Sequence, residues 1–210
     1  MALDKFEKQG AEVFEKTVSP NDLSDHELIE ATKRGDEAAF GEVMRRYRSP
    51  ITNYIYRFLN DYEEAVDLAQ ETFVRVYFAL ERYHTEYAFS TYIYRIATNL
   101  AISEIRKRKR RKLVSLTGLF QFDNEEAQDF NPPDEKPLPD ENLIEGEQST
   151  TIARAIATLP EKYRAPIVLR DVEGKSYEEV AAIMQLGLGT TKSRISRARK
   201  LLREKLENYF

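Results

Sequence analysis

The side chains best suited to chemistry in this chain are basic, and they gather in two clusters. From Arg106 to Lys112 the sequence reads RKRKRRK, seven basic residues in seven positions. The second cluster, from Thr190 to Lys205, holds seven basic residues and one acid. Guanidinium and ammonium groups at this density hold phosphates, and Lys and Arg can also read guanine edges in the major groove. Together the clusters indicate nucleic-acid binding, although each alone is also typical of a solvated basic face.

An acidic stretch between the clusters hides them in the net charge of −4. Residues 123–147 carry ten acids and one basic residue, Lys136, and four of the eight prolines lie at positions 132–139. Such a segment has too few aliphatic side chains to offset the entropy lost on ordering. We therefore expect a flexible acidic linker over 113–148.

Few residues in the sequence could support catalysis or bind a metal. Cys is absent, and the two histidines, His26 and His84, are far apart without metal-ligand spacing. No glycine-rich phosphate loop occurs, and the paired carboxylates Asp67 and Glu71 sit among apolar positions with helical spacing, which suits docking better than acid–base work. We expect no catalytic residue, no metal site, no cofactor and no enzymatic activity.

The sequence also lacks the signals of a membrane or exported protein. No apolar run reaches the roughly 20 residues of a membrane span. The first ten residues are of mixed charge and have no apolar core of the kind that a secretory signal needs. We expect a cytoplasmic protein without membrane insertion.

The first half of the chain has the apolar periodicity of helices. Ser24 with Glu27 forms a capping box that opens a short helix, and Gly35 closes it. Pro50 predicts a kink or a break in the long second helix. Helices are expected over 24–35, 40–58, 61–80 and 90–108.

The last third of the chain has the pattern of a helix-turn-helix. Ser176 begins a capping box, Gly187 and Gly189 are expected to supply turn conformations that larger residues disfavour, and Thr190 or Thr191 can cap the last helix. A capped helix, a glycine turn and a basic second helix together favour DNA binding over an ordinary helical hairpin. Helices are expected over 150–159, 161–171, 177–184 and 190–206.

The expected fold is therefore all-α, with two small helical domains joined by the flexible acidic linker. The expected boundaries are an N-terminal extension over 1–20, a first domain over 21–112, the linker over 113–148 and a second domain over 149–210. We expect the N-terminal extension to be mobile.

Residues Ala157–Leu206 resemble region four of the extracytoplasmic-function (ECF) sigma factors, the promoter −35 reading domain of these sigma-70 family proteins. The resemblance rests on Leu159-Pro160, on SYEE from Ser176 to Glu179, and on GTTKSRISRAR from Gly189 to Arg199. Thr191 stands where the family more often has an aliphatic residue. The resemblance implies contacts with the base edges of −35 DNA from Lys192, Ser193, Ser196 and Arg197, with Thr190, Arg194 and Arg199 nearer the phosphates.

Residues Tyr62–Tyr77, YEEAVDLAQETFVRVY, resemble the part of sigma region two that docks on RNA polymerase. Asp67, Gln70 and Glu71 fall at three- and four-residue steps on one helical face. A polar, acidic stripe of this kind can meet a basic partner helix, although by spacing alone a solvated face is the commoner explanation. The resemblance implies that these three residues bind polymerase.

Residues Ala88–Arg111 resemble the promoter-melting and −10 recognition segment of the same family. This chain has Tyr92-Ile93-Tyr94-Arg95-Ile96-Ala97 where the family usually has Trp-Leu-Tyr-Arg-Ile-Ala. Melting requires the capture of unstacked bases, which aromatic side chains beside cations achieve by stacking worth roughly 1–3 kcal/mol per base. Tyr94 is expected in the core. The residues expected to contact −10 DNA are Tyr83, Tyr87, Phe89, Tyr92, Arg95, Arg106 and Lys107.

The resemblance implies a sigma factor that binds core RNA polymerase, at the clamp helices of the largest subunit and at the flap, and directs initiation at specific promoters. It also implies an anti-sigma protein as a partner, which can be soluble or can hold the factor at the inner face of the membrane. Two other hypotheses stay open. A DNA-binding regulator that does not dock on polymerase would leave Asp67, Gln70 and Glu71 dispensable, and an enzyme is the weakest.

Overall fold

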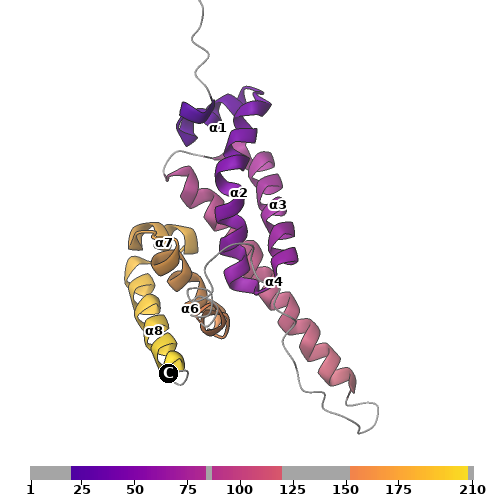
Figure 1. The fold of residues 1–210 in the computed structure, drawn as a ribbon, viewed down its shortest axis with the longest axis vertical. Coiled ribbons are helices and arrows are strands. Elements are labelled where there is room, and N and C mark those ends of the chain that lie inside the picture. Colours follow the sequence, from indigo (N-terminus) through magenta and orange to yellow (C-terminus); the bar gives the residue numbers. More distant parts are fainter. Residues whose placement is uncertain (1–19, 84–86, 120–151, 208–210) are drawn as a thin grey trace, which may run out of the picture. The chain divides into compact units, whose positions relative to one another are not determined.

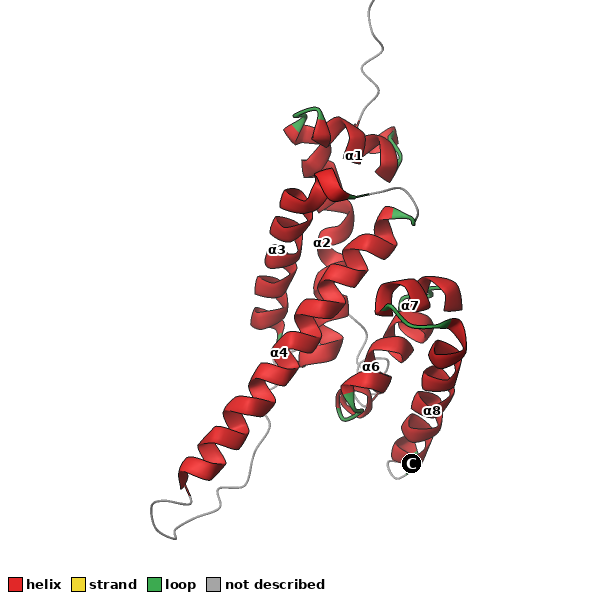
Figure 2. Cartoon of the chain, turned by 180° about the vertical axis from the view of Figure 1, so that it is seen from behind, coloured by secondary structure: helices red, strands yellow, loops and turns green. Residues whose placement is uncertain are grey.

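The computed structural model describes residues 20–83, 87–119 and 152–207, and within them every regular element is helical (Figures 1 and 2). The prediction of an all-α fold is confirmed. The chain divides into two compact units, Met1–Tyr47 and Arg48–Phe210. Nearly all of the expected N-terminal extension and residues 120–148 of the expected linker lie outside the described residues.

The first unit contains η1 (Pro20–Asp22), α1 (Asp25–Lys33) and the beginning of α2 (Glu37–Leu59). Ser24 caps α1 through the predicted capping box, in which the backbone N–H of Ser24 donates to the Glu27 carboxylate over 2.7 Å. The chain leaves the helix through Gly35, whose φ of +94° favours glycine. Arg46 lies 3.0 Å from Asp25 and 2.7 Å from Glu42, and it thereby ties α1 to α2.

The break predicted at Pro50 does not occur, and α2 continues from Glu37 to Leu59. A proline removes one backbone hydrogen bond from the helix interior. Ile51, Tyr54 and Ile55, in the turn and a half that follows, are fully buried, and each such burial is worth roughly 1.5–3 kcal/mol. Burial therefore outweighs the local cost of the proline.

The rest of α2 belongs to the second unit, with α3 (Tyr62–Ala79), η2 (Leu80–Arg82) and α4 (Phe89–Leu119). Helices α3 and α4 pack along each other (Figure 1). The buried hydroxyls of Tyr54 and Thr98 lie 2.7 Å apart, so that the polar group of Tyr54 has a partner inside the apolar core. Burial raises the pKa of Tyr54 well above its usual value. The apolar side chains that α3 and α4 bury include Leu68, Phe73, Val76, Ile93, Ala97 and Leu100.

Helix α4 runs to Leu119, eleven residues beyond the expected end at Arg108. Arg, Lys and Leu are good helix formers, and neither Gly nor Pro follows Arg108 until Gly118, so no local signal ends the helix earlier. Residues 113–119, expected in the linker, are therefore helical, and the whole basic cluster lies on α4.

The second unit ends in a helix-turn-helix. Residues 152–157 are helical and are followed by α6 (Glu161–Ile167), a π-helical turn η3 (Val168–Val172), α7 (Tyr177–Met184) and α8 (Leu188–Leu206). Helix α8 packs against α6 and α7, with Thr191, Ile195 and Ala198 buried. These elements match the expected helices closely, and the helix-turn-helix prediction is confirmed.

The turn between α7 and α8 is built differently from the expectation for Gly187 and Gly189. The left-handed residue is Gln185, with φ 53° and ψ 48°, whereas Gly187 has φ −66° and Gly189 lies inside α8. A Cβ added to either glycine would meet no atom within 4 Å. The expectation was wrong because a single non-glycine residue can take the left-handed conformation at a helix C-terminus at modest cost.

The expected threonine cap of the last helix is also wrong. Helix α8 begins at Leu188, and its N-cap is Gly187, which has no side chain to accept a hydrogen bond. Thr191 is buried instead, and its hydroxyl donates to the backbone carbonyl of Gly187 over 3.2 Å. The threonine therefore stabilises the first turn from inside the helix.

Candidate docking surface and nucleic-acid interfaces

One face of α3 is exposed along its length. Asp61 caps the helix, because its carboxylate accepts a hydrogen bond of 3.2 Å from the backbone N–H of Glu64. Asp67 and Gln70 are exposed and Glu71 is half-buried, so the three residues expected to bind polymerase lie on the surface. Glu71 pairs with Arg75, one turn further on, at 2.5 Å. In the described part of the chain, no cation pairs with Asp67.

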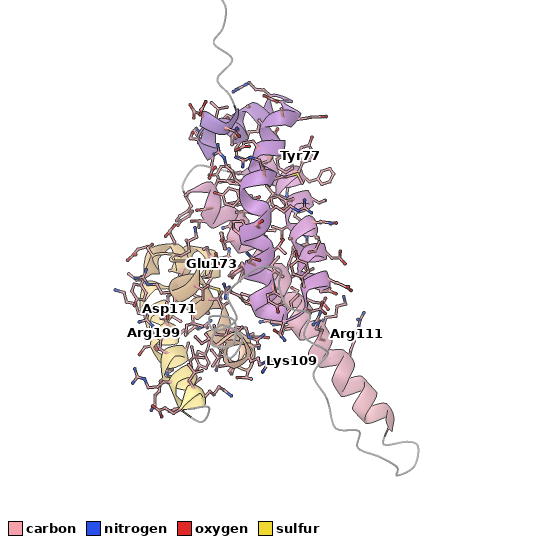
Figure 3. All side chains as sticks on the ribbon, viewed as in Figure 1. Tyr77, Lys109, Arg111, Asp171, Glu173 and Arg199 are labelled. Carbon is pink, nitrogen blue, oxygen red and sulfur yellow. The ribbon has the colours of Figure 1, made fainter. Side chains whose placement is uncertain are left out.

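The same face continues into apolar residues that the sequence reasoning did not single out. Val74 is 53% exposed and Phe78 is 81% exposed, and they follow Asp67 and Glu71 at helical steps of three and four. The Tyr77 ring contacts that of Phe78, with centroids 5.8 Å apart, and projects from α3 (Figure 3). The sequence signal that could have revealed this apolar patch is the presence of Val74 and Phe78 on the polar side of the helix. Such exposed apolar side chains, gathered on one face, mark an interaction site.

The aromatic residues expected at −10 DNA divide into buried and exposed members. Tyr83 and Phe89 are in the core, with ring centroids 5.8 Å apart. The Tyr83 hydroxyl donates to the backbone carbonyl of Tyr87 over 2.9 Å, and the Tyr87 ring itself is 54% exposed. Tyr94 is buried, as expected. Tyr83 therefore holds the backbone at Tyr87 from the core, while the Tyr87 side chain is presented to solvent.

Tyr92 joins the aromatic cluster to a cation. Its ring lies 5.1 Å from that of Tyr83, and the Arg95 guanidinium lies over it at 5.4 Å from the ring centroid. Partial burial raises the pKa of Tyr92, with the charge of Arg95 opposing. A half-buried aromatic ring beside a cation is the arrangement that can stack on an unpaired base and hold its phosphate.

The basic cluster of α4 is largely paired with carboxylates of the same chain. Arg106 lies 2.9 Å from Glu161, and Lys107 lies 3.0 Å from Glu104, whose side chain is buried. Arg108 reaches Asp61, the N-cap of α3, at 3.0 Å. Two of the cations expected at −10 DNA, Arg106 and Lys107, are therefore already engaged by acids.

The outward side of α8 carries small hydroxyls among cations. Thr190, Ser193 and Ser196 are exposed and lie away from the buried Ile195, and Arg194 is half-buried on one flank. Small side chains let a helix approach base edges closely, and serine can donate to or accept from either base of a pair. The geometry thus brings the three expected −35 hydroxyl residues, Thr190, Ser193 and Ser196, to one surface.

Three of the expected −35 cations interact with other elements. The ammonium of Lys192 lies 5.7 Å from the centroid of the Tyr177 ring at the start of α7. A hydrogen bond from Arg197 lowers the pKa of Tyr163 in α6. Arg199 makes a two-pronged pair with Asp171 of η3 at 2.6 and 2.9 Å, a partner that the sequence reasoning missed.

The described residues contain no group of three or more His, Cys, Asp or Glu side chains that could hold a metal ion. None of their helices combines the length and apolar character needed to cross a membrane.

Two family models match this chain: Sigma-70 region 2 over residues 43–111 and Sigma-70, region 4 over residues 149–202. The chain is 38% identical over 187 residues to the RNA polymerase sigma-H factor of Pseudomonas aeruginosa, covering 87% of this chain and 94% of that one. It is 36% identical over 185 residues to the ECF RNA polymerase sigma factor SigW of Bacillus subtilis, covering 86% and 95%.

Two solved structures have the same fold. The sigma factor RpoE of Bartonella quintana, in complex with the anti-sigma factor NepR, has a TM-score of 0.59 and 25% identity, covering 80% of this chain and 96% of that one. CnrH in complex with the cytosolic domain of CnrY has a TM-score of 0.62 at 22% identity, covering 88% and 97%.

An exposed stripe on one helix and a basic helix-turn-helix, within matches to sigma regions 2 and 4, define a sigma subunit of the sigma-70 type. The chain belongs to the extracytoplasmic-function RNA polymerase sigma factors. Members of this family bind core RNA polymerase and promoter DNA and direct where transcription begins.

Proposed function

We propose that this sigma factor docks on core RNA polymerase through the exposed face of α3. The observation that carries the proposal is the composition of that face, which is acidic at Asp67 and Glu71 and apolar at Val74 and Phe78. An acidic end steers the encounter with a basic partner, whereas large apolar side chains supply affinity when they are desolvated. The partner that this face fits is a pair of helices with basic and apolar positions, and we assign it to the clamp helices of the largest polymerase subunit.

The −10 strand is proposed to bind at the start of α4. Tyr87 and Tyr92 would stack on unpaired bases, with Arg95 as the adjacent cation, while Tyr83, packed against Phe89, holds the backbone carbonyl of Tyr87. Arg106 and Lys107 would hold phosphates after exchanging Glu161 and Glu104 for DNA. Such contacts position the strand but carry no sequence information.

The −35 duplex is proposed to bind the outward face of α8. Ser193, Ser196 and Arg197 are exposed there and would face the major groove, with Lys192 and Arg194 on its two sides. Thr190, in the first turn of α8, would lie nearest the backbone. A helix that enters the groove by its N-terminal half is the usual geometry of this motif.

The functional boundaries proposed for the chain are a polymerase and −10 module over 21–112 and a −35 module over 149–210, joined by the segment 113–148, whose first seven residues continue α4. The family-model matches over 43–111 and 149–202 support this division. Two separately matched modules suit a protein that must read two promoter elements.

We further propose that an anti-sigma protein controls this factor in the cytoplasm. Support comes from the related RpoE of Bartonella quintana, which was solved with the anti-sigma factor NepR. A membrane-bound anti-sigma protein would hold the factor at the inner face of the membrane. The proposed role is binding and positioning, with no catalytic step.

The test begins with core polymerase and purified chain. Asp67→Lys is expected to weaken core binding at least a hundredfold, because a lysine would face a basic partner. Phe78→Ser is expected to weaken it about tenfold. Glu37→Lys reverses the charge at an exposed position of α2; it is the matched control and should bind core polymerase as wild type does. Unchanged core binding by Asp67→Lys would show that docking does not use this face of α3, and absence of core binding by the wild-type chain would favour a DNA-binding regulator that acts without docking.

The second part of the test is transcription. Genomic fragments retained by the reconstituted holoenzyme are sequenced and used as templates in vitro. The proposal expects transcripts that start at a fixed distance from shared −35 and −10 elements. A holoenzyme that makes no promoter-specific product from any retained fragment refutes it.

A further inference from the structure

The Arg199–Asp171 pair joins the DNA-reading helix to the π-helical turn that precedes α7. The guanidinium Nε donates to Asp171 Oδ2 over 2.9 Å, and Nη2 donates to Oδ1 over 2.6 Å. Figure 3 labels both residues, which come from α8 and η3. Two parallel hydrogen bonds fix the orientation of the two groups as well as their distance. Hydrogen bonding to Asp171 also raises the pKa of Arg199.

Asp171 is itself held by the local fold. It lies in η3, where the backbone widens to a π-helical turn, a feature that is frequent at functional sites. The neighbouring Arg170 donates to the backbone carbonyl of Lys175 over 2.8 Å and covers the Tyr177 ring at 4.7 Å. The carboxylate therefore projects from a braced segment.

A second contact lies on the same flank of α8. Lys192 and Arg199 are seven residues apart, two helical turns, and so point in nearly the same direction. Lys192 lies over Tyr177 at 5.7 Å, and Arg199 pairs with Asp171. Contacts at both ends of one flank oppose rotation of α8 about its own axis. Such rotation would turn Ser193 and Ser196 away from the bases.

We propose that Asp171 and Arg199 are positioning residues for −35 recognition, which set the rotation of α8 and do not themselves hold DNA. The inference rests on the proposed function of α8 and adds the residues that regulate its geometry. It assigns Arg199 a role different from the phosphate contact that the family resemblance implied.

The pair can be removed without unfolding the protein. The side chains of Asp171 and Arg199 are about one third and one half exposed, and exposed ion pairs contribute little to folding stability. A change in DNA recognition after their substitution therefore reports on position. Circular dichroism and the thermal midpoint of each variant are measured alongside to show that the fold is retained.

The experiment compares two probes bound by the reconstituted holoenzyme at several salt concentrations: a promoter fragment recovered from genomic DNA, and the same fragment with its −35 element scrambled. Asp171→Asn and Arg199→Lys are each expected to reduce the preference for the intact −35 element five- to tenfold. The salt slope, which is the dependence of the logarithm of the affinity on the logarithm of the salt concentration, should be unchanged. Lys200→Gln is the matched loss of one charge on α8, and it should leave that preference as in wild type.

A phosphate contact by Arg199 predicts the opposite pattern. Arg199→Lys would then keep the wild-type preference, because lysine also holds phosphate, and Asp171→Asn would bind both probes equally or more tightly with a steeper salt slope. Either result overturns the positioning role. If wild-type holoenzyme shows no preference for the intact −35 element, the proposed function of α8 fails first, which is a separate outcome.

Discussion

The two basic clusters of this sigma factor look alike in sequence and differ in the structure. In α4, Arg106, Lys107 and Arg108 all pair with carboxylates at 2.9–3.0 Å, so ion pairs within the folded protein neutralise much of the positive charge of this cluster. In α8, the outward face keeps Ser193, Ser196 and Arg197 exposed, with Lys192 and Arg194 on its two sides. The difference shows that the number of cations in a segment does not measure the charge available to DNA.

The clusters also differ in what a partner must do. In the proposed complex, DNA at α4 would have to displace Glu161 and Glu104, so that binding there would exchange one ion pair for another. DNA at α8 would instead meet hydroxyl groups that are already exposed. We therefore expect α4 to contribute a sequence-blind and salt-sensitive contact, and α8 to contribute the specificity.

The sharpest test of this contrast is a carboxylate placed on each helix. Ser196→Glu is expected to weaken promoter binding by the holoenzyme about a hundredfold, because the new charge would lie against the major groove. Ser103→Glu, at an exposed position of α4, should weaken it less than about threefold. Fluorescence anisotropy with a promoter fragment measures both. Equal losses would remove the distinction between the two helices.

A second test uses a paired cation of α4. Arg108 reaches Asp61 at 3.0 Å, Glu104 at 3.5 Å and Glu64 at 3.8 Å, and it links α4 to the first turn of α3. Arg108→Ala is expected to lower the free energy of unfolding by about 0.5–1 kcal/mol, an amount reduced by the partial exposure of the group. Urea unfolding measures the loss. An unchanged midpoint would mean that the network does not stabilise α4.

A third test uses a cation of α4 for which the described residues provide no carboxylate. Arg110 is exposed. Arg110→Ala is expected to weaken binding to scrambled DNA about threefold and to reduce the salt slope by about one, with no change in unfolding. Arg108→Ala serves as its counterpart. If Arg108→Ala reduces the salt slope more than Arg110→Ala does, then pairing within the protein does not limit DNA contact.

The smallest effect is expected from a substitution at Glu42 of α2, whose partner cations have no proposed role in DNA binding. Hydrogen bonds from Arg45, at 2.7 and 2.8 Å, and from Arg46 lower the pKa of Glu42 to about 2, against 4.5 for an unperturbed glutamate. A lowered folded-state pKa adds stability that is fully present above about pH 4.5 and is lost as the pH falls towards 2. Thermal midpoints from pH 7 to pH 2.5 should fall less for Glu42→Gln than for wild type. If the thermal midpoints of wild type and Glu42→Gln fall equally with pH, the two arginines do not lower the pKa of Glu42.

The elements of the fold could largely be predicted from the sequence, because their signals are local. Capping at Ser24, Asp61 and Ser176 and the spacing of buried apolar residues set the helices, and the structure agrees at each. The errors were local as well. The sequence alone predicted a glycine turn where Gln185 takes the left-handed conformation, and it ended α4 too early, since helix formers carry no mark of where a helix stops.

The family resemblance also located the candidate surfaces, because the motifs that carry it lie within single helices. Asp67, Gln70 and Glu71 share the surface of α3, and Ser193 and Ser196 share that of α8, as the helical period requires. The exposure of Phe78 could have been inferred from its position beside the polar stripe. The burial of Tyr83 and Phe89 could not, because a loop gives no period from which to assign a side.

The amino-acid pattern alone defines which residues share a helix and a face, since that follows from a repeat of 3.6 residues. Which charges remain available to a partner depends on how the helices pack together. Arg106 meets Glu161, Arg108 meets Asp61 and Arg199 meets Asp171, partners that lie 28 to 55 residues away in the chain. An ion pair forms where folding brings opposite charges together, and no local pattern encodes that distance.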